Sequence, residues 1–434
     1  MTIRRQGGRG AEPGRTTQNR SHVAPSAGGC GDELAAAEFF AGMGLVRRAL
    51  EAEAILGEAA PAPGRRLWRT VFANDYDPMK RRIYSASFDD ADSVLNGDDI
   101  GELSCGEIPR ADLWTASFPC TDLSLAGRGL GIHAGQSGAV WHLLRLLEET
   151  PDQERPAHLL FENVMGLLSS HGGADFRALV EAVNRLGYGV DPVCVNASCF
   201  VPQSRARLFL LCARLEMRSI ADPETVEPCS ARPARIVSAM RRSADLLWHA
   251  RPLPALPTRR TGLDQMIEDV PDDSPLWWAP KRAEYFLGQV HPEHLATARA
   301  LINGERVSHT PAFRRVREVM DANSGVKKKR SVIELRTDGL AGCLRTPKGG
   351  SARQIVLKAG RGAWRVRLMT PLECARLQGV DELPDGFRDI DLQFGLGDAV
   401  CVPAVRWALD RLTEGAVETR ENTKATQSLF SASA

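Results

Sequence analysis

The sequence predicts an α/β protein with a Rossmann-like, nucleotide-binding sheet and a smaller, irregular second domain. An apolar stretch, a glycine turn and a helix-like stretch follow one another over residues 34–56, as at the start of nucleotide-binding α/β units. Apolar strand-like stretches then alternate with helix-like ones up to residue 212, which is typical of a largely parallel sheet. From about residue 216, proline-rich stretches replace this alternation and indicate a different kind of domain.

The composition is that of a soluble globular protein. The chain has 434 residues, of which 43% are hydrophobic and 25% charged, and its net charge is +1. No apolar run reaches the roughly 20 residues that a membrane helix needs, so we expect no membrane partner. The ten cysteines form no Cys-x-x-Cys pair and have no histidine at metal-ligand spacing. This predicts a reducing cytoplasm and no metal site.

The first two strand-like stretches are followed by residues suited to a nucleotide. After residues 34–40, Gly42 and Gly44 would let a ligand approach the backbone at the start of a helix over 46–56. After residues 67–73, Asp75 is placed to bind ribose hydroxyls, and Tyr76 offers a face for an adenine ring. Ordinary turn and capping chemistry remains an alternative for such an acid.

Cys120 follows a short buried strand over residues 111–115. Pro119 ends this strand because it has no N–H to give, so Cys120 lies at the strand's carboxyl end, where open α/β sheets carry their chemistry. Glycines at 127, 129 and 131 make the following loop easy to bend. The pattern indicates a nucleophile beside a mobile loop, although a lone cysteine is more often a structural one.

A carboxylate and two arginines complete the polar set of this predicted sheet. Glu162 comes at the tip of the next strand, residues 157–161, and parallel strand tips converge on one edge, which brings it within reach of what Cys120 attacks. Before a final strand over 208–212, Gln203, Arg205 and Arg207 alternate. Alternate residues point to one side of a strand, an arrangement that grips a planar polar ligand or phosphates.

The near-neutral net charge conceals a basic segment. Residues 305–367 contain sixteen Lys or Arg and five Asp or Glu, a local net charge of +11. Such a segment inside a neutral protein indicates a polyanion partner, phosphate backbones first, with a solvated basic face as the alternative.

Taken in order, these motifs resemble those of the DNA (cytosine-5) methyltransferases over about two-thirds of the chain. Residues 38–44 are similar to the first S-adenosylmethionine motif, Phe118-Pro119-Cys120 with Ser124 to the catalytic motif, and Glu162-Asn163-Val164 to the next one. Gln203-x-Arg205-x-Arg207, residues 367–378 and residues 397–400 resemble the last motifs. Six motifs in family order favour a catalytic Cys120 over a structural one.

The resemblance implies a domain organisation. Residues 34–215 would form the catalytic and cofactor-binding domain, 216–366 the target-recognition domain that binds DNA, and 367–415 a return to the catalytic domain. We expect disordered tails at 1–33 and 416–434.

It also implies roles for single residues. Cys120 would add to cytosine C6, Glu162 would hold N3 and the exocyclic amine, and Arg207 would hold the O2 edge with support from Arg205. The expected S-adenosylmethionine contacts are Phe39, Ala41, Gly42, Gly44, Asp75, Tyr76, Asp99, Pro119, Asp398 and Val400. The expected DNA contacts are Ser124, Arg128, Gln203, Arg345, Lys348 and Arg353.

Three positions depart from the family pattern. Leu45 stands at the usual third glycine of the first motif, Asp398 at the usual asparagine of the last, and Thr121 at the glutamine common after the catalytic cysteine. None of these changes removes a group that the chemistry requires.

The expected partner is double-stranded DNA, with the enzyme acting as a monomer; a cognate restriction or phage-defence protein stays open. A transfer-RNA cytosine-5 methyltransferase is the nearest alternative, but that branch usually has Pro-Pro-Cys and a Cys-Phe-Thr segment, which this chain lacks. A catalytically silent DNA-binding relative is the second, and intact Cys120 and Glu162 count against it.

Overall fold

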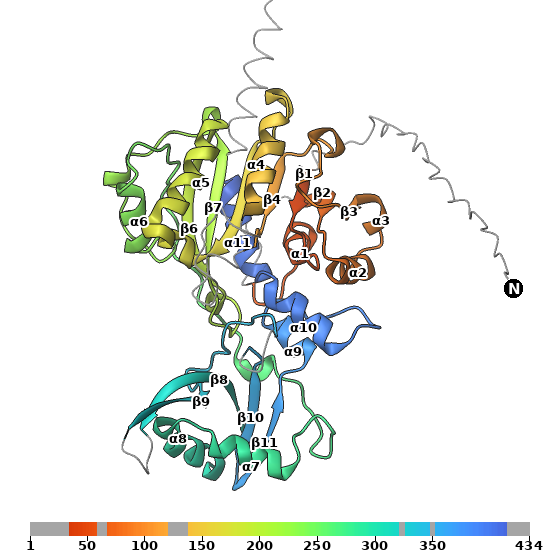
Figure 1. Ribbon diagram of the computed structural model, residues 1–434, viewed down its shortest axis with the longest axis vertical. Helices are drawn as coiled ribbons and strands as arrows, with labels where there is room; N and C mark the ends of the chain where they lie inside the picture. The colour runs from red at the N-terminus through yellow and green to blue at the C-terminus, as the bar shows by residue number, and fades with distance from the viewer. Residues whose placement is uncertain (1–33, 59–66, 120–137, 321–325, 348–351, 415–434) are drawn as a thin grey trace, which may run out of the picture. The chain divides into compact units, whose positions relative to one another are not determined.

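A computed structural model describes residues 34–58, 67–119, 138–320, 326–347 and 352–414. Its larger sheet has seven strands in the order β3-β2-β1-β4-β5-β7-β6 (Figure 1). The first five in chain order run parallel, whereas β7 is antiparallel to β5 and to β6. The strands are β1 (Leu34–Phe39), β2 (Trp68–Asn74), β3 (Leu95–Asn96), β4 (Leu113–Ala116), β5 (His158–Val164), β6 (Tyr188–Asn196) and β7 (Ala206–Arg214).

Helices cover both faces of this sheet: adjacent strand residues, which point to opposite faces, belong to two different hydrophobic cores that each include helices. Ala36 and Leu113 belong to a core shared with α1 (Leu45–Glu51) and α11 (Val402–Thr413). Their neighbours Ala37 and Trp114 belong to a second core shared with α4 (Ala139–Glu149) and α5 (Ala174–Arg185). Parallel sheets are buried on both faces, so the predicted α/β class is confirmed. After β2, the chain forms helices α2 (Pro78–Ser87) and α3 (Ala91–Val94), of which α3 lies against β2.

The second domain is regular, where the sequence predicted an irregular one. It contains a four-stranded antiparallel sheet in the order β11-β10-β8-β9. Its strands are β8 (Ser308–Met320), β9 (Lys327–Leu335), β10 (Ile355–Gly360) and β11 (Ala363–Leu368). Two helices, α7 (Pro280–Gly288) and α8 (Pro292–Asn303), share a separate hydrophobic core with this sheet.

The packing does not change at residue 216, where the sequence predicted a boundary. Helix α6 (Ala234–Arg241) and the buried Trp248 belong to the same core as α4 and α5. After the second sheet, α9 (Pro371–Arg376) and α10 (Asp389–Asp398) lead back towards α11. Buried Arg367, at the end of β11, pairs with buried Glu373 of α9 and joins the two parts of the chain.

Two element bounds differ from the predicted ones. Helix α1 ends at Glu51 instead of Leu56, because Arg406 of α11 donates hydrogen bonds to the carbonyls of Ala49 and Ala52 and so takes over the helix end. Strand β5 continues past residue 161 to Val164, because its last residues pair with β7. Glu162 therefore lies inside a strand.

Acid should destabilise the fold through His249. This side chain is 1% exposed, and neither ring nitrogen has a hydrogen-bond partner among the residues that the structure describes. Burial, helped by Arg218 and Arg251, lowers the pKa of His249 to about 4, whereas an unfolded histidine has a pKa of about 6.5. The unfolded state then binds the extra proton first, so stability falls as pH drops from about 6.5 towards 4.

The expected loss is on the order of 2 kcal/mol at pH 5, measured as the free energy of unfolding in urea at pH 7.5 and 5. The variant His249→Gln lacks the titrating ring and should lose this part of the pH dependence. Equal pH dependence in both proteins would contradict the assignment.

Candidate active site

The carboxyl ends of four strands meet at one edge of the large sheet. Phe39 of β1 lies opposite Asn74 of β2 and Ala116 of β4, and Ala116 lies opposite Phe161 of β5. The glycine turn, Asp75, the segment 117–119 and Glu162 each follow one of these positions directly. The parallel register thus brings the predicted cofactor-binding and catalytic segments together.

The turn after β1 offers its open side at Gly42. Phe40, Gly42 and Gly44 all have positive φ, of 57°, 60° and 87°. A Cβ placed at Gly42 would meet no atom of the described residues within 4 Å, so as far as these residues are concerned a ligand can approach the backbone there. A Cβ at Gly44 would lie 2.3 Å from the ring of Phe88. Gly44 is therefore needed for packing against Phe88, and its contact with a cofactor, which only its backbone could make, stays a prediction.

Asp75 holds the turn in place. Its carboxylate accepts hydrogen bonds from the backbone N–H of Gly42 at 2.7 Å and of Asp77 at 2.9 Å. Burial raises the pKa of Asp75, and the positive charge of Lys80 opposes this shift. The next side chain, Tyr76, is 55% exposed. A buried acid beside an exposed aromatic ring suits a ribose and an adenine.

Three predicted cofactor contacts lie in the hydrophobic cores. Phe39 is fully buried, with its ring centroid 4.9 Å from that of Trp114. Val400 is 3% exposed and Ala41 6% exposed. Phe39 and Val400 thus present almost no side-chain surface to a ligand. Phe40, the next residue, packs half-buried against the same core as Phe39 with a left-handed backbone, and it is the more accessible ring.

The remaining predicted cofactor contacts are accessible. Asp99 is exposed and accepts the Gly101 N–H at 2.8 Å, and Pro119 is half-buried. Asp398, at the end of α10, forms an ion pair of 2.8 Å with Lys80 of α2. The family's asparagine could not make this ion pair, so the substitution at Asp398 is matched by a cation.

Glu162 and Arg207 form the polar centre of the site. Arg207 Nε lies 2.9 Å from Glu162 Oε1, and both side chains are largely buried. Next to Glu162, Asn163 Nδ2 donates to the carbonyl of Phe118 at 3.2 Å. Asn163 therefore ties the end of β5 to the segment that leads into Cys120. Cys120 itself, like Ser124, Arg128 and Lys348, lies outside the described residues.

The sequence predicted that Gln203, Arg205 and Arg207 lie on one face of a strand. This is wrong, because β7 begins at Ala206 and contains only Arg207 of the three. Arg205 is 3% exposed and donates to the carbonyls of Leu344 at 2.8 Å and Ala399. Burial, and the charge of Arg207, lower the pKa of Arg205. It connects three distant segments of the chain from inside the protein.

Gln203 is fully buried. Its amide donates to the Leu377 carbonyl at 2.6 Å and accepts the Leu344 N–H at 3.0 Å. With both ends engaged and no exposed surface, Gln203 does not fit the predicted DNA contact.

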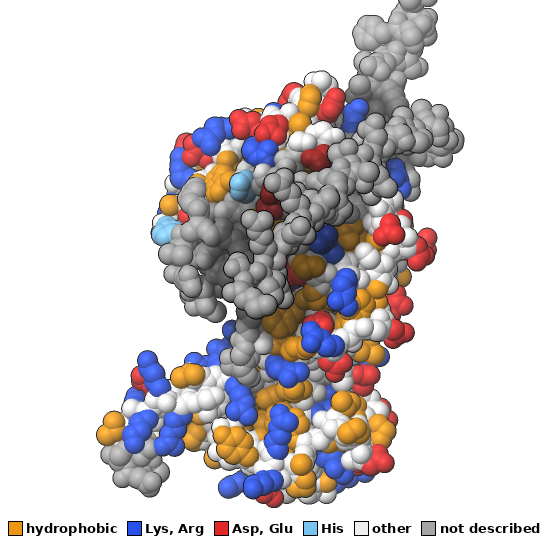
Figure 2. Space-filling model, turned by 45° about the vertical axis from the view of Figure 1, so that its right-hand side comes forward, with side chains coloured by type: hydrophobic (Ala, Val, Ile, Leu, Met, Phe, Trp, Pro, Cys, Tyr) orange, Lys and Arg blue, Asp and Glu red, His pale blue; other side chains and the backbone are white. Residues whose placement is uncertain are grey.

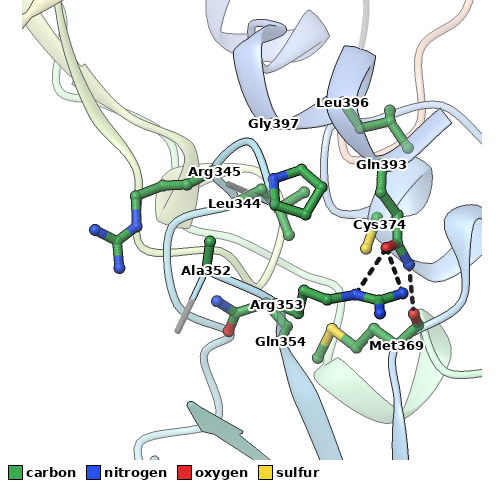
Figure 3. A pocket seen from close by; sticks show the side chains of 11 residues that line it. Leu344, Arg345, Ala352, Arg353, Gln354, Met369, Cys374, Gln393, Leu396 and Gly397 are labelled. Atoms are coloured by element: carbon green, nitrogen blue, oxygen red, sulfur yellow. Dashed lines mark hydrogen bonds between the residues drawn. The ribbon is translucent and has the colours of Figure 1, made fainter. Parts of the chain in front are cut away.

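Arg345 and Arg353 border a small, mostly apolar pocket that residues 344–347 and 352–354 form with helices α9 and α10 (Figure 3). Arg353 is half-buried and donates to Gln393 Oε1 at 3.0 Å, whereas Arg345 is exposed and extends away from the other labelled side chains. Of the two, Arg345 is the one free to reach a phosphate.

Sequence reasoning missed Phe40, Lys80, Asn163 and Cys343 as members of this site. Asn163 stood in the quoted Glu-Asn-Val motif, and Phe40 is next to the residue chosen. Lys80 and Cys343 are joined to the site only through contacts between distant parts of the chain.

Among the described residues, no group of histidine, cysteine or acidic side chains is arranged to hold a metal ion. Nor does that part of the chain contain a helix with the length and apolarity to cross a membrane.

Comparisons with known proteins agree with this arrangement. The Type II methyltransferase M2.BsuMI of Bacillus subtilis (strain 168) is 37% identical over 153 residues, which are 35% of this chain and 37% of that protein. The Type II methyltransferase M.NgoBI of Neisseria gonorrhoeae is 30% identical over 142 residues, 32% of this chain and 42% of that protein. The chain thus spans about two-fifths of the length of these curated relatives.

The solved structure of the Entamoeba histolytica methyltransferase EhMeth shares the fold, with a TM-score of 0.55 at 14% identity over 88% of this chain and 99% of that one. A family model, C-5 cytosine-specific DNA methylase, matches residues 34–413. This match covers most of the chain, and the protein belongs to the C-5 cytosine-specific DNA methylase family.

Proposed function

We propose that this protein transfers a methyl group from S-adenosylmethionine to C5 of a flipped-out cytosine in a specific sequence of double-stranded DNA. The observation that carries this proposal is the Glu162–Arg207 pair at the sheet edge, beside the strand that leads into Phe118-Pro119-Cys120. An acid and a guanidinium suit the N3–C4 amine edge and the O2 atom of a cytosine ring respectively.

The residues of the first two strands fit the proposed cofactor. The open backbone at Gly42 leaves room for a ligand, the Asp75 carboxylate can accept from ribose hydroxyls, and the exposed Tyr76 ring can stack on adenine. The aromatic contact that the resemblance assigns to Phe39 is proposed instead for Phe40, the more accessible ring. When bound, S-adenosylmethionine supplies an electrophilic methyl group.

The chain's own residues then activate the base. C5 of cytosine is a poor nucleophile, so the Cys120 thiolate adds to C6 and forms a covalent bond to the ring. Glu162 holds the N3 edge as electrons move into the ring, and Arg207 stabilises the negative charge that develops on O2. After methyl transfer to C5, loss of the C5 proton expels the thiolate and restores the aromatic ring.

The DNA partner is favoured by a projecting, basic β-ribbon. Strand β8 pairs with β10 only over Ser308–Ala312, so Phe313–Met320 pairs with β9 alone. This β8–β9 ribbon is about 26 Å long at roughly 3.3 Å per residue. Strands β8 and β9 together carry seven Lys or Arg and two Glu. Figure 2 shows these basic side chains on the arm at the lower left. A two-stranded ribbon fits the DNA major groove.

Neutralising the ribbon should weaken DNA binding without changing catalysis at saturating DNA. For a variant with Lys327, Lys328 and Lys329 all changed to Ala, we expect roughly tenfold or greater loss of affinity near 0.1 M salt. The slope of log affinity against log salt should fall by up to about 3, because each lost phosphate contact contributes about 0.9. Fluorescence anisotropy with a labelled duplex measures both.

A matched control changes Arg177 and Arg185 to Ala on α5, where both side chains pair with acidic neighbours. If this control lowers the slope as much as the ribbon variant does, the ribbon is not the contact surface. Residues 216–366, which include the ribbon, then lose their proposed role in target recognition.

The related alternatives differ in substrate or in activity. A transfer-RNA methyltransferase of similar fold would label tRNA, and a silent DNA-binding relative would label nothing. Incubation of the enzyme with radiolabelled S-adenosylmethionine and either duplex DNA or tRNA separates the three. We expect label in duplex DNA only, and label in tRNA alone or in neither would refute the proposal. We further propose that the enzyme acts in the cytoplasm, alone or with a cognate restriction or defence protein.

A further inference from the structure

The thiol of Cys343 lies against both arginines of the candidate active site. Arg205 Nη1 donates to Cys343 Sγ at 3.2 Å, Cys343 Sγ lies 3.4 Å from the Leu344 carbonyl, and Arg207 lies close enough for its charge to act on the thiol. Arg207 is the residue that pairs with Glu162 at 2.9 Å. Cys343 is therefore one side chain away from the carboxylate that we propose binds the base.

The position of Cys343 is fixed on both sides. Ala341 N–H donates to the Pro202 carbonyl at 2.7 Å, and the Ala341 carbonyl accepts the Ser204 N–H at 3.0 Å. On the other side, the Leu344 N–H donates to Gln203 Oε1 at 3.0 Å. The segment that carries Cys343 is thus hydrogen-bonded to the residues just before β7, so the contact of the sulfur with Arg205 and Arg207 is a built feature of the site.

The charges around the sulfur explain why a soft acceptor is useful there. Burial together with the charge of Arg207 lowers the pKa of Arg205, so two guanidiniums act on each other beside a single carboxylate, Glu162. Burial opposes ionisation of Cys343, but the charges and hydrogen bonds of Arg205 and Arg207 outweigh it and lower the pKa of the thiol. A thiolate at this position would relieve the repulsion between the two cations.

We propose that Cys343 is a positioning residue of the base site: its sulfur accepts a hydrogen bond from Arg205, lies beside Arg207, and so helps to hold Arg207 where it pairs with Glu162. The proposal rests on the proposed function, because it assigns the base site to Glu162 and Arg207. Cys343 need not touch the base. It acts through Arg207, and its ionisation makes the arrangement depend on pH.

Steady-state kinetics of methyl transfer test this role. Cys343→Ala should lower kcat roughly tenfold with KM for DNA within about twofold, because Arg205 loses an acceptor and Arg207 loses the neighbour that helps to hold it, while the DNA surface is intact. Cys343→Ser keeps an acceptor and should stay within about threefold of wild type at neutral pH. Cys105→Ala is the matched control, since that half-buried thiol contacts the Glu149 carbonyl instead. It should behave as wild type.

A pH series distinguishes positioning from a merely structural role. The hydroxyl of Cys343→Ser does not ionise, so the ratio of wild-type to variant kcat should rise between about pH 6.5 and 9, as the wild-type thiolate forms. A constant ratio, or a Cys343→Ala enzyme with wild-type kcat, would overturn the proposal.

Alkylation of Cys343 gives a readout that does not depend on activity. Iodoacetamide labelling at a series of pH values, followed by peptide mass mapping, should reach half its maximal rate below the pH of about 8.5 expected for an ordinary thiol. In Arg207→Gln the midpoint should move to higher pH. If the pH midpoint of Cys343 alkylation does not move, this proposal is contradicted even when methyl transfer is confirmed. If the midpoint shifts but no methyl transfer is detected, the proposed function is contradicted instead.

Discussion

Changing Cys120 to Ser should abolish methyl transfer while the protein still binds duplex DNA. A serine hydroxyl is a much weaker nucleophile than a thiolate at neutral pH, so the addition at C6 that activates the ring fails. We expect kcat to fall by at least roughly 10³-fold. Transfer of a labelled methyl group measures the loss, and fluorescence anisotropy should show an affinity for DNA within about threefold of wild type.

The control is Cys105→Ser, which removes a thiol on the segment before β4. It should leave both measurements unchanged. Turnover of Cys120→Ser close to that of wild type would show that another group, or another mechanism, activates the base.

The second large effect should come from Glu162→Gln. Glutamine keeps the shape and can still accept from Arg207, but it has no negative charge to pair with that guanidinium and cannot hold a protonated N3. General acid–base groups contribute about 10² to 10⁴ in rate, so kcat should fall within that range. Rapid-quench single-turnover measurements isolate the chemical step from product release.

A matched acid is Glu149, which pairs with Arg145 on the exposed side of α4. Glu149→Gln should leave the rate within about twofold of wild type. Should Glu162→Gln turn over as fast as Glu149→Gln, Glu162 would not hold the base. Thermal melting of both variants excludes unfolding as the cause of a loss.

The large sheet was predictable because its strands are continuous apolar runs punctuated by glycine, proline and acidic residues. The same signals marked Asp75 and Glu162 at strand ends. The sequence placed Glu162 at the tip of a strand over 157–161, whereas β5 continues to Val164 because its end pairs with β7. This pairing joins residues more than 40 positions apart. Local patterns do not report such pairing.

The choice between Phe39 and Phe40 shows a second limit. Adjacent strand residues face opposite sides, but both faces of this sheet are buried, so hydrophobicity does not say which ring enters the core. The positive φ at Phe40 distinguishes the two rings, and no local sequence pattern predicts a left-handed backbone at a phenylalanine.

The second sheet was missed for the opposite reason. Beyond the part that pairs with β10, both faces of the β8–β9 ribbon are exposed. A strand with one buried face would have apolar residues at every second position, but Arg315, Arg317 and Lys329 occupy such positions here. Without that alternation the period of two is absent. Cys343 was missed because its partner Arg205 is 138 residues away.

Trapping the covalent adduct with DNA tests the central claim most directly. A duplex in which the target cytosine carries fluorine at C5 cannot lose a C5 proton, so after methyl transfer the bond between the enzyme and C6 should persist. We predict an enzyme–DNA adduct in denaturing gels that requires S-adenosylmethionine, and peptide mapping should place it on Cys120. If no adduct forms while the enzyme methylates ordinary duplex DNA, or if the adduct maps to another residue, the proposed mechanism is contradicted.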